Sequence, residues 1–301
     1  MTTIEWVKNK DGSQGKSWNP VTGCTKISPG CKHCYAERMA RRLAGRYGYP
    51  PAPRHFDVTL HLDRLDEPLK RKKPTTFFVC SMGDLFHESV HFGDTATIFD
   101  IMARTPQHTY QVLTKRPQNA LRFFDWYKYP VTRYKWPFSN VWSGVTVENQ
   151  ATADERRADF EAISAAVKFV SFEPALGPID WAGWEFVDQI ISGGESGPGA
   201  RPSHPDWHRA ALDFCQENDI AYFFKQWGAW KPIGDFDPQT GVYHYSWQHA
   251  EPYRRVASVG LDGNVYGNDY PPAHGWHMAR VTKKRAGHLL DGQAWREFPH
   301  V

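Results

Sequence analysis

The sequence has no uninterrupted apolar run close to 18 residues, so it predicts no helix that could span a bilayer. It also has no strong excess of one charge. The formal net charge is +3, which is compatible with a phosphate-bearing partner but does not identify one. No secretory segment opens the chain. These features predict a soluble protein of 301 residues, with one large domain, an appendage and no membrane partner.

Cysteine is scarce, and the odd count of five argues against a disulfide framework. Three of the five, Cys24, Cys31 and Cys34, share one loop with the spacing Cys-x6-Cys-x2-Cys. Cys80 and Cys215 lie within or beside apolar runs, which is the usual setting of a small buried core residue. Clustered, reduced cysteines without a secretory segment predict a cytoplasmic location.

Three thiolates can hold three irons of a [4Fe–4S] cube, and a loop with no fourth ligand leaves one iron open to a substrate or cofactor. The glycines and prolines of the loop let the backbone fold around a bulky cluster, and residues 36–42 predict a helix that leaves it. Two alternatives remain. One is a structural Cys3His zinc site with His33, although His33 lies between two of the cysteines, where tetrahedral ligation is strained. The other is a disulfide pair.

A strand-then-helix pattern recurs along the body of the chain. Strands are predicted by β-branched and aromatic runs at 75–80, 109–113, 140–145, 167–172, 187–191 and 220–224. Helices are predicted by apolar residues at helical spacing in 94–104, 154–165 and 205–217. Alternating strands and helices indicate an α/β protein with a parallel sheet. Near-continuous apolar strands and units of about thirty residues fit a parallel βα (TIM-like) barrel, partial or full.

Polar residues follow these strands repeatedly. The exits read Ser81-Met82-Gly83-Asp84, Thr114-Lys115-Arg116, Thr146-Val147-Glu148-Asn149, Glu173-Pro174, Ser192-Gly193-Gly194-Glu195-Ser196 and Lys225-Gln226. A single polar exit is most often an ordinary solvated loop. In a parallel barrel, however, all exits share the face on which active sites are assembled, so six in succession favour a functional face.

The last part of the chain differs in character. Residues 1–227 are predicted to form the barrel, with the cysteine loop at 18–35, and residues 228–301 form an aromatic-rich C-terminal extension. Within it, 256–266 predicts a β-hairpin turned at Asp262-Gly263. Aromatic residues interleaved with lysine and arginine suit either base stacking and phosphate neutralisation or a small lid packed on the barrel.

Several motifs resemble a phage-borne family long described as a domain of unknown function. They are Gly23-Cys24-Thr25-Lys26-Ile27-Ser28-Pro29-Gly30-Cys31, Cys34-Tyr35-Ala36-Glu37, Gly194-Glu195-Ser196-Gly197, Ala200-Arg201-Pro202, Phe223-Phe224-Lys225-Gln226-Trp227-Gly228 and Ala286-Gly287-His288-Leu289-Leu290-Asp291-Gly292. The likeness covers about residues 18–299. The loop and the barrel pattern also resemble the radical S-adenosylmethionine (SAM) superfamily, whose usual motif, Cys-x3-Cys-x2-Cys, is three residues shorter between the first two cysteines.

The resemblance implies that Cys24, Cys31 and Cys34 hold a [4Fe–4S] cluster whose open iron chelates SAM. An electron passed through the cluster would cleave SAM to methionine and a 5′-deoxyadenosyl radical, which abstracts hydrogen from the substrate. The implied partner is a reducing electron donor similar to flavodoxin or ferredoxin.

The resemblance also implies binding residues at the strand exits. Those expected to bind SAM are His33, Ser81, Asp84, Lys115, Thr146, Glu148 and Asn149. Those expected to bind the substrate are Glu173, Glu195, Ser196, Arg201, Lys225 and Lys284. Gly193-Gly194-Glu195 spells the motif that usually receives the SAM amino group but follows a later strand, so its glycines are read as allowing close approach of SAM or substrate. As an alternative, the lysines and arginines pair with Glu148, Glu173 or Glu195 to keep the barrel mouth neutral.

The favoured function is a radical SAM enzyme that modifies a nucleobase or nucleotide. An example is an isomerase that rearranges an amino-acid-modified thymidine in bacteriophage DNA, which would act in the host cytoplasm. One alternative is a radical SAM enzyme acting on a peptide or small metabolite. The other is a non-catalytic nucleic-acid-binding protein stabilised by zinc or iron–sulfur.

Overall fold

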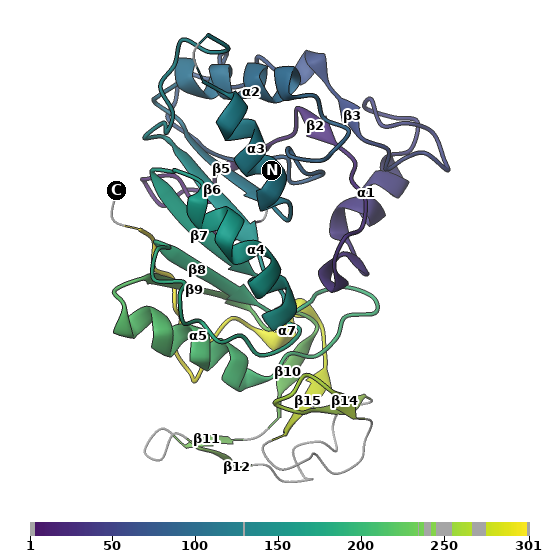
Figure 1. Ribbon diagram of the computed structural model, residues 1–301. Helices are drawn as coiled ribbons and strands as arrows, with labels where there is room; N and C mark the ends of the chain where they lie inside the picture. Colours follow the sequence, from purple (N-terminus) through teal and green to yellow (C-terminus); the bar gives the residue numbers. More distant parts are fainter. Residues whose placement is uncertain are drawn as a thin grey trace. The chain divides into compact units, whose positions relative to one another are not determined.

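The computed structural model describes residues 4–128, 130–233, 235–237, 242–244, 255–266 and 275–299. Its main sheet has seven strands, β1 (Lys16–Trp18), β4 (Thr76–Val79), β5 (Thr109–Thr114), β6 (Val141–Thr146), β7 (Val167–Phe172), β8 (Gln189–Gly193) and β9 (Ala221–Gln226). They are hydrogen-bonded in that order (Figure 1). Neighbours such as β4 and β5 run parallel. Because the spatial order follows the chain order, the topology is compatible with a partial TIM-like barrel.

All six predicted strands are present, and β7 has the predicted bounds. The one strand of the main sheet that the sequence did not predict is β1. Its three residues, Lys16-Ser17-Trp18, include no β-branched side chain. It forms because its backbone pairs with β4, and Trp18 is fully buried there. This strand matters for the site because the cysteine loop follows it.

Contacts divide the chain into two compact units. The first contains residues 1–146 and 154–169, and the second contains 147–153 and 170–300. The predicted extension, 228–301, falls almost wholly within the second unit, and the boundary predicted after Trp227 stays a prediction. No helix in the described ranges is long and apolar enough to cross a membrane.

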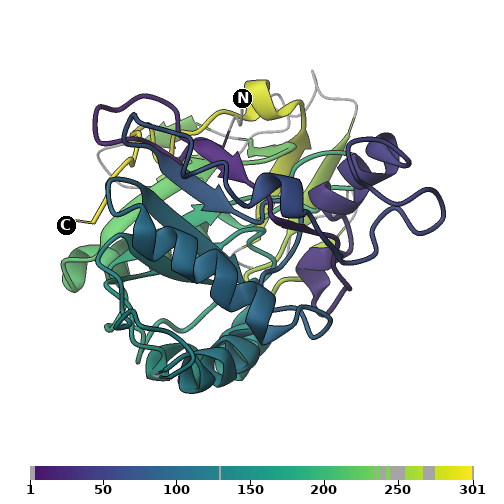
Figure 2. The ribbon, with the colours of Figure 1, turned by 90° about the horizontal axis from the view of Figure 1, so that it is seen from above.

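The helices of the first unit are α1 (Tyr35–Leu43), α2 (Phe92–Arg104) and α3 (Pro117–Trp126), and α4 (Gln150–Ala162) lies mostly in it. Helices α2 and α3 lie side by side (Figures 1 and 2) because their aromatic rings interlock. The ring of Phe99 lies 5.2 Å from that of Phe123 and 5.3 Å from that of Phe124. A short antiparallel pair, β2 (Val21–Thr22) and β3 (Thr59–Leu60), completes the surroundings of the cysteine loop.

The second unit packs α5 (Pro205–Glu217) against β8 and β9. A four-stranded sheet has the order β10 (Trp230–Pro232), β15 (Trp276–Arg280), β13 (Val256–Val259) and β14 (Val265–Tyr266). The remaining elements are the pair β11 (Asp235–Asp237) and β12 (Val242–His244) and the short helix α7 (Lys283–Ala286). The antiparallel β13–β14 pair confirms the predicted hairpin, in which Gly263 has a φ of 91°. Four aromatic residues of the predicted extension, Tyr245, Trp247, Tyr253 and Tyr270, lie outside the described residues.

The end of the chain returns to the main sheet. Phe224 N–H donates to the Trp295 carbonyl at 3.1 Å, and Glu297 N–H donates to the Tyr222 carbonyl at 3.1 Å. These bonds cover the outer edge of β9 with the segment around Arg296, which forms an antiparallel bridge with Phe223. A covered edge no longer offers free backbone groups to another chain.

A buried histidine is expected to make the second unit sensitive to acid. His208 lies between Ser192 Oγ, 2.6 Å from Nδ1, and Ser203 Oγ, 2.9 Å from Nε2. Burial, with a smaller effect of the His204 and Arg209 charges, lowers its pKa from 6.5 to about 3. The unfolded chain therefore binds the extra proton first, and stability rises with pH across this window. Between about pH 6.5 and pH 5 we expect a loss of about 2 kcal/mol of unfolding free energy from this residue.

Urea unfolding of the protein and of His208→Gln, compared at about pH 7 and about pH 5, measures that loss. Glutamine can still donate to one serine and accept from the other, but it does not titrate. The variant should therefore show a shallower loss of stability on acidification. An equal loss in both proteins would mean that other groups govern the acid sensitivity.

Candidate functional site

The three clustered cysteines lie in three successive pieces of local structure. Cys24 follows β2, Cys31 ends the 3-10 turn Pro29–Cys31, and Cys34 is the N-cap of α1. Cys31 N–H donates to the Ser28 carbonyl at 3.0 Å. None of the three is in a disulfide, and all are partly exposed, whereas Cys80 and Cys215 are free and buried, as predicted. The loop therefore presents three available thiols.

A glycine fixes the start of this loop. Gly23 has a φ of 85°, and a Cβ atom there would lie 2.1 Å from the Asp57 carbonyl oxygen. Its N–H donates to the Met82 carbonyl at 2.9 Å, which ties the loop to the exit of β4. A larger residue would have to push the Cys24 backbone away from both neighbours.

The cysteine side chains of the loop are spread apart. In the described part of the chain, no three His, Cys, Asp or Glu side chains are grouped closely enough to hold one metal ion. Thiolates that share one zinc lie about 3.8 Å apart, because each Zn–S bond is about 2.3 Å and the geometry is tetrahedral. In a [4Fe–4S] cube, each thiolate binds a different iron. Both the [4Fe–4S] cluster and the alternative Cys3His zinc site therefore stay predictions.

The environments of two of these thiols differ. Burial, reinforced by the Asp84 charge, raises the pKa of Cys24 to about 11. Burial also acts to raise the pKa of Cys31, but backbone hydrogen bonding from Ile27 and the charge of Lys115 hold it below its ordinary value. Cys31 is therefore the more readily ionised of the two.

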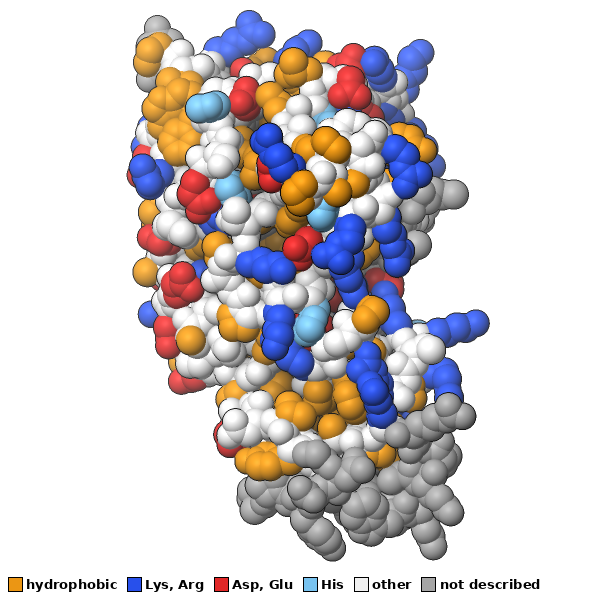
Figure 3. Space-filling model, turned by 90° about the vertical axis from the view of Figure 1, so that its right-hand side faces the viewer, with side chains coloured by type: hydrophobic (Ala, Val, Ile, Leu, Met, Phe, Trp, Pro, Cys, Tyr) orange, Lys and Arg blue, Asp and Glu red, His pale blue; other side chains and the backbone are white. Residues whose placement is uncertain are grey.

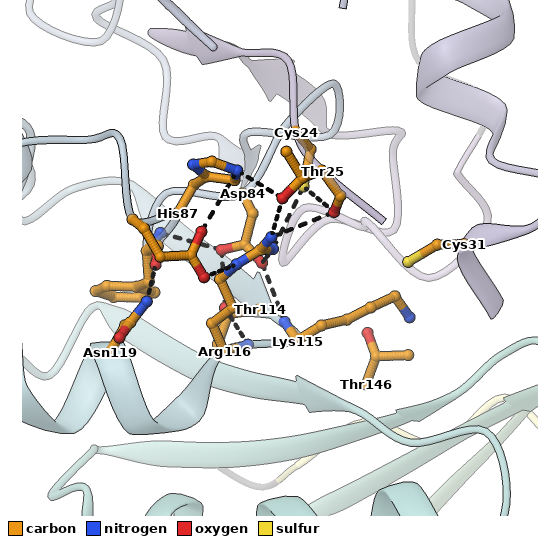
Figure 4. Close-up of polar contacts among 12 residues, drawn as sticks. Cys24, Thr25, Cys31, Asp84, His87, Thr114, Lys115, Arg116, Asn119 and Thr146 are labelled. Carbon is orange, nitrogen blue, oxygen red and sulfur yellow. Dashed lines mark hydrogen bonds and ion pairs between the residues drawn. The ribbon is translucent and has the colours of Figure 1, made fainter. Parts of the chain in front are cut away.

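Arg116, at the exit of β5, binds the Cys24 side of the loop (Figure 4). Its side chain is 1% exposed. Nη1 donates to Cys24 Sγ at 3.4 Å, and Nη2 donates to the Thr25 carbonyl at 3.2 Å and to Thr25 Oγ1 at 2.8 Å. Nε donates to Glu88 Oε1 at 2.9 Å. A planar guanidinium can serve all these acceptors at once, which a lysine ammonium could not do in the same geometry.

Asp84, at the exit of β4, joins this network. Its Oδ1 accepts from Thr114 Oγ1 at 2.8 Å and from Phe86 N–H at 3.0 Å. Its Oδ2 accepts from Lys115 N–H at 3.1 Å and from Arg116 Nη1 at 3.4 Å. The exits of β4 and β5 therefore meet, as the strand pattern predicts. The carboxylate, expected from the resemblance to receive SAM, is buried and bound to protein donors on both oxygens.

His87 and Thr25 belong to the same network but were missed by the sequence reasoning. His87 Nδ1 accepts from Ser89 N–H at 3.0 Å, so we assign the ring proton to Nε2, which donates to Thr25 Oγ1 at 2.9 Å. Glu88, bound to Arg116, was also missed. For His87 and Glu88, the signal available in the sequence was their position, three and four residues after Asp84 in the same strand exit.

Other predicted SAM residues lie near this network. Ser81 Oγ donates to Asn19 Oδ1 at 3.2 Å, which joins the exits of β1 and β4. The Lys115 side chain extends toward Cys31 (Figure 4), in accord with its effect on the pKa of that thiol. Thr146 ends β6 and is buried, and its carbonyl accepts from Arg156 Nη1 at 2.7 Å. His33 is half-buried within the cysteine loop.

Glu148 and Asn149 are involved in starting α4. Thr152 Oγ1 accepts from Glu148 N–H at 2.8 Å, and Asn149 Oδ1 accepts from Thr152 N–H at 3.1 Å. This is the hydrogen bonding of a helix N-cap. Glu148 is fully buried, and its carbonyl accepts from Leu176 N–H at 2.8 Å. The local structure thus gives these two residues a role in the fold in addition to the predicted contact with ribose.

In the second unit, predicted substrate residues form two ion pairs. Lys225 Nζ lies 2.8 Å from both oxygens of Glu173. Arg201 binds Glu195 through Nε and Nη2, at 2.8 and 2.7 Å, and Glu195 is only 6% exposed. These are the neutralising pairs that the sequence left open as an alternative. Of the remaining predicted residues, Ser196 is half-buried and Lys284 is exposed on α7.

The glycines before Glu195 meet the protein's own backbone. A Cβ atom on Gly194 would lie 2.2 Å from the Trp227 carbonyl oxygen. One on Gly228, which has a φ of 80°, would lie 2.1 Å from the Glu195 carbonyl oxygen. The close approach at Gly194 and Gly228 therefore brings the β8 and β9 exits together and gives these glycines a role in the fold. The predicted approach of SAM or substrate to this exit stays a prediction.

Comparison with known proteins gives one match. No curated protein sequence and no solved structure matches the chain. A family model matches residues 1–299, which include the cysteine loop and every strand exit discussed above. This confirms the resemblance to a family described as a domain of unknown function. The chain belongs to that family, whose description reads "Protein of unknown function (DUF5131)".

Proposed function

We propose that this protein is a radical SAM enzyme with a fold of that superfamily's type, in which Cys24, Cys31 and Cys34 hold a [4Fe–4S] cluster. The observation that carries the proposal is a set of three free, partly exposed thiols in one loop, anchored by Arg116 to the exits of the next two parallel strands. Three thiols without a fourth are the donor set of a cluster with one open iron. When bound, the cluster and SAM together supply a 5′-deoxyadenosyl radical that abstracts hydrogen from the substrate.

The chain's own residues prepare the loop for this role. Arg116 donates to Cys24 Sγ, and an N–H donor aimed at a thiolate stabilises its negative charge. Thr25, held by both Arg116 and His87, keeps the adjoining backbone in place. The Lys115 side chain brings a positive charge toward Cys31. A cluster with three thiolates is anionic, so these two cations favour the loaded state.

Asp84 supports the two basic residues, Lys115 and Arg116, through hydrogen bonds. It accepts from the Lys115 backbone N–H at 3.1 Å and from Arg116 Nη1 at 3.4 Å, so the Lys115 backbone and the Arg116 guanidinium are held in place. A ligand site held by residues that are themselves hydrogen-bonded loses less order when the ligand binds. The resemblance implies that the Asp84 carboxylate and the backbone carbonyls around Ser81 receive the SAM amino group, and that assignment remains part of the proposal.

Anaerobic reconstitution with iron and sulfide tests the cofactor. We expect about four irons per chain, a brown colour and, after reduction with dithionite, conversion of SAM to methionine and 5′-deoxyadenosine. Stoichiometric zinc with negligible iron would reject the proposal. So would a fully loaded protein that binds no SAM and yields neither product.

For the substrate we propose a nucleobase or nucleotide, with an amino-acid-modified thymidine in DNA as the reference case and isomerisation or rearrangement as the reaction. The support is the family likeness and the basic segment Lys283, Lys284 and Arg285 of α7. Turnover on duplex DNA should fall as salt rises, because phosphate contacts release counterions. Equal turnover on the free nucleoside and on DNA would move the assignment to a small molecule.

A further inference from the structure

Helix α1, which follows the cysteine loop, has one packed face and one open face. Ala36 and Ala40 are buried against Tyr49 and Met82. On the other side, residues 35, 38 and 42 follow the spacing of one helical stripe. Tyr35 is 57% exposed, and Arg41 and Arg42 are exposed. Arg38 is half-buried.

Positive charge is concentrated here. The segment 24–49 carries six lysines and arginines and one glutamate, a net charge of +5, whereas the whole chain carries +3. The single acid, Glu37, is paired with Lys26 at 2.9 Å. Among the described residues, none is an acidic partner of Arg38, Arg41 or Arg42. Figure 3 looks onto the side on which α1 lies, and lysine and arginine side chains gather there.

Helix stability accounts for part of this charge and not for the rest. Arg41 and Arg42 lie in the last turn of α1, where a cation interacts favourably with the helix dipole. Arg46, which follows the helix, donates to the Arg42 carbonyl, so it too supports the end of α1. The argument does not extend to Lys32, which precedes the helix. Arg38 and Arg42 are like charges four residues apart, an arrangement that weakens a helix. The accumulation is therefore better explained by a ligand of opposite charge.

The open face also has the composition of a protein interface. Tyr35 is 57% exposed at the start of the helix, and Tyr47, which follows the helix, is 75% exposed. Tyrosine and arginine are the residues enriched where proteins bind one another.

The exposed face of α1 lies next to the cysteine loop, and this closeness indicates which kind of ligand it binds. Lys32 lies between Cys31 and Cys34, and Cys34 is the N-cap of α1. Nine helical residues span about 14 Å, so a partner docked anywhere along α1 lies within about that distance of the cysteine loop. A polyphosphate would be attracted by the same charges but would bring no electron to the loop. An electron-transfer protein needs this proximity.

We propose that the surface formed by Lys32, Tyr35, Arg38, Arg41, Arg42 and Arg46 docks an acidic electron-transfer protein. The inference rests on the proposed function, because the electron must have a cluster to enter. In the transfer, the reduced donor loses one electron and the oxidised cluster gains it, and no bond forms or breaks. Complementary charge suits such a partner because it speeds encounter and still permits release.

The test uses the reconstituted protein and, as probe, purified reduced flavodoxin, an acidic one-electron donor. Cluster reduction is measured as the loss of absorbance at about 400 nm after rapid mixing at low salt. Arg41→Glu/Arg42→Glu should slow reduction by flavodoxin at least about tenfold, the lower end of the range for electrostatic steering. Lys10→Glu/Lys72→Glu, which reverses two exposed charges elsewhere in the first unit, should not. Raising the salt should slow the unmodified protein toward the rate of the variant.

Dithionite, a small reductant that needs no docking, separates this proposal from the proposed function. It should reduce the cluster equally in the unmodified protein and in both variants. If dithionite reduces the cluster in none of the three proteins, or if no cluster is present, the proposed function itself is overturned. Equal reduction by flavodoxin in the arginine variant and the unmodified protein would overturn the docking proposal alone. So would a variant that keeps flavodoxin reduction but loses affinity for a labelled duplex oligonucleotide, which would assign the surface to nucleic acid. Calorimetric titration with oxidised flavodoxin should show the same loss of affinity in the arginine variant without any turnover.

Discussion

Replacing Cys24, Cys31 or Cys34 with alanine, one at a time, is expected to abolish the iron–sulfur cluster and all cleavage of SAM. Each thiolate would bind a separate iron, so losing one leaves a second iron without a protein ligand and the cube unstable. All three are free and partly exposed; Cys34 also packs against the buried cluster of α1, so its replacement adds a small packing cost to the loss of iron. Iron and sulfide analysis after anaerobic reconstitution, with the brown colour as a visible check, measures the effect.

Cys80→Ala and Cys215→Ala are the matched controls. Cys80 and Cys215 are 4% and 0% exposed and lie in the cores of their respective units. Together with the three loop cysteines they account for all five cysteines of the chain. Each substitution should leave only a small cavity, costing about 1 kcal/mol, and should retain the full iron content. Loss of iron from either control, or its retention in any of the three loop variants, would contradict the ligand assignment.

Asp84→Asn is expected to lower the unfolding free energy by about 3 kcal/mol, because it leaves the buried Arg116 without its buried counter-charge. The new amide can still accept from Thr114 with its oxygen. Its NH2 group would then face the Lys115 N–H and the Arg116 guanidinium, which are both donors. Urea denaturation measures the loss, and hydrogen exchange in residues 23–26 should rise because Arg116 no longer holds them firmly.

Glu88→Gln provides the comparison for this prediction. Glu88 also contacts Arg116, at 2.9 Å, but its side chain is 57% exposed, so solvent screens the pair and the expected cost is below about 1 kcal/mol. If Asp84→Asn instead keeps full stability and a complete cluster but no longer cleaves SAM, the carboxylate acts on SAM and not on the fold. Equal destabilisation by both substitutions would show that burial does not distinguish the two carboxylates.

The sequence by itself determined the elements whose signal is local. The run 167–172 became β7 and the segment 205–217 became α5 with no change of bounds. A run rich in valine and phenylalanine and an amphipathic helix opened by Pro205 need little help from distant residues. The meeting of Asp84 with Thr114 and Lys115 was also predictable, since parallel strands bring their exits to the same edge. The membership of the family could likewise be read from motifs alone.

Only the tertiary structure decided the partners. Arg116 donates to Cys24, which lies 92 residues earlier in the sequence, and Glu173 pairs with Lys225, which lies 52 residues later. Nothing local separates those pairings from the alternatives, because charge and hydrogen-bonding capacity are the same for every candidate until the backbone brings two of them within reach. β1 formed for the same reason, since a three-residue strand is stable only against a neighbour that is already in place. The approach of Gly194 to the Trp227 carbonyl and the return of Trp295 to β9 were likewise settled by space filling and backbone pairing, which depend on three-dimensional proximity and not on sequence spacing.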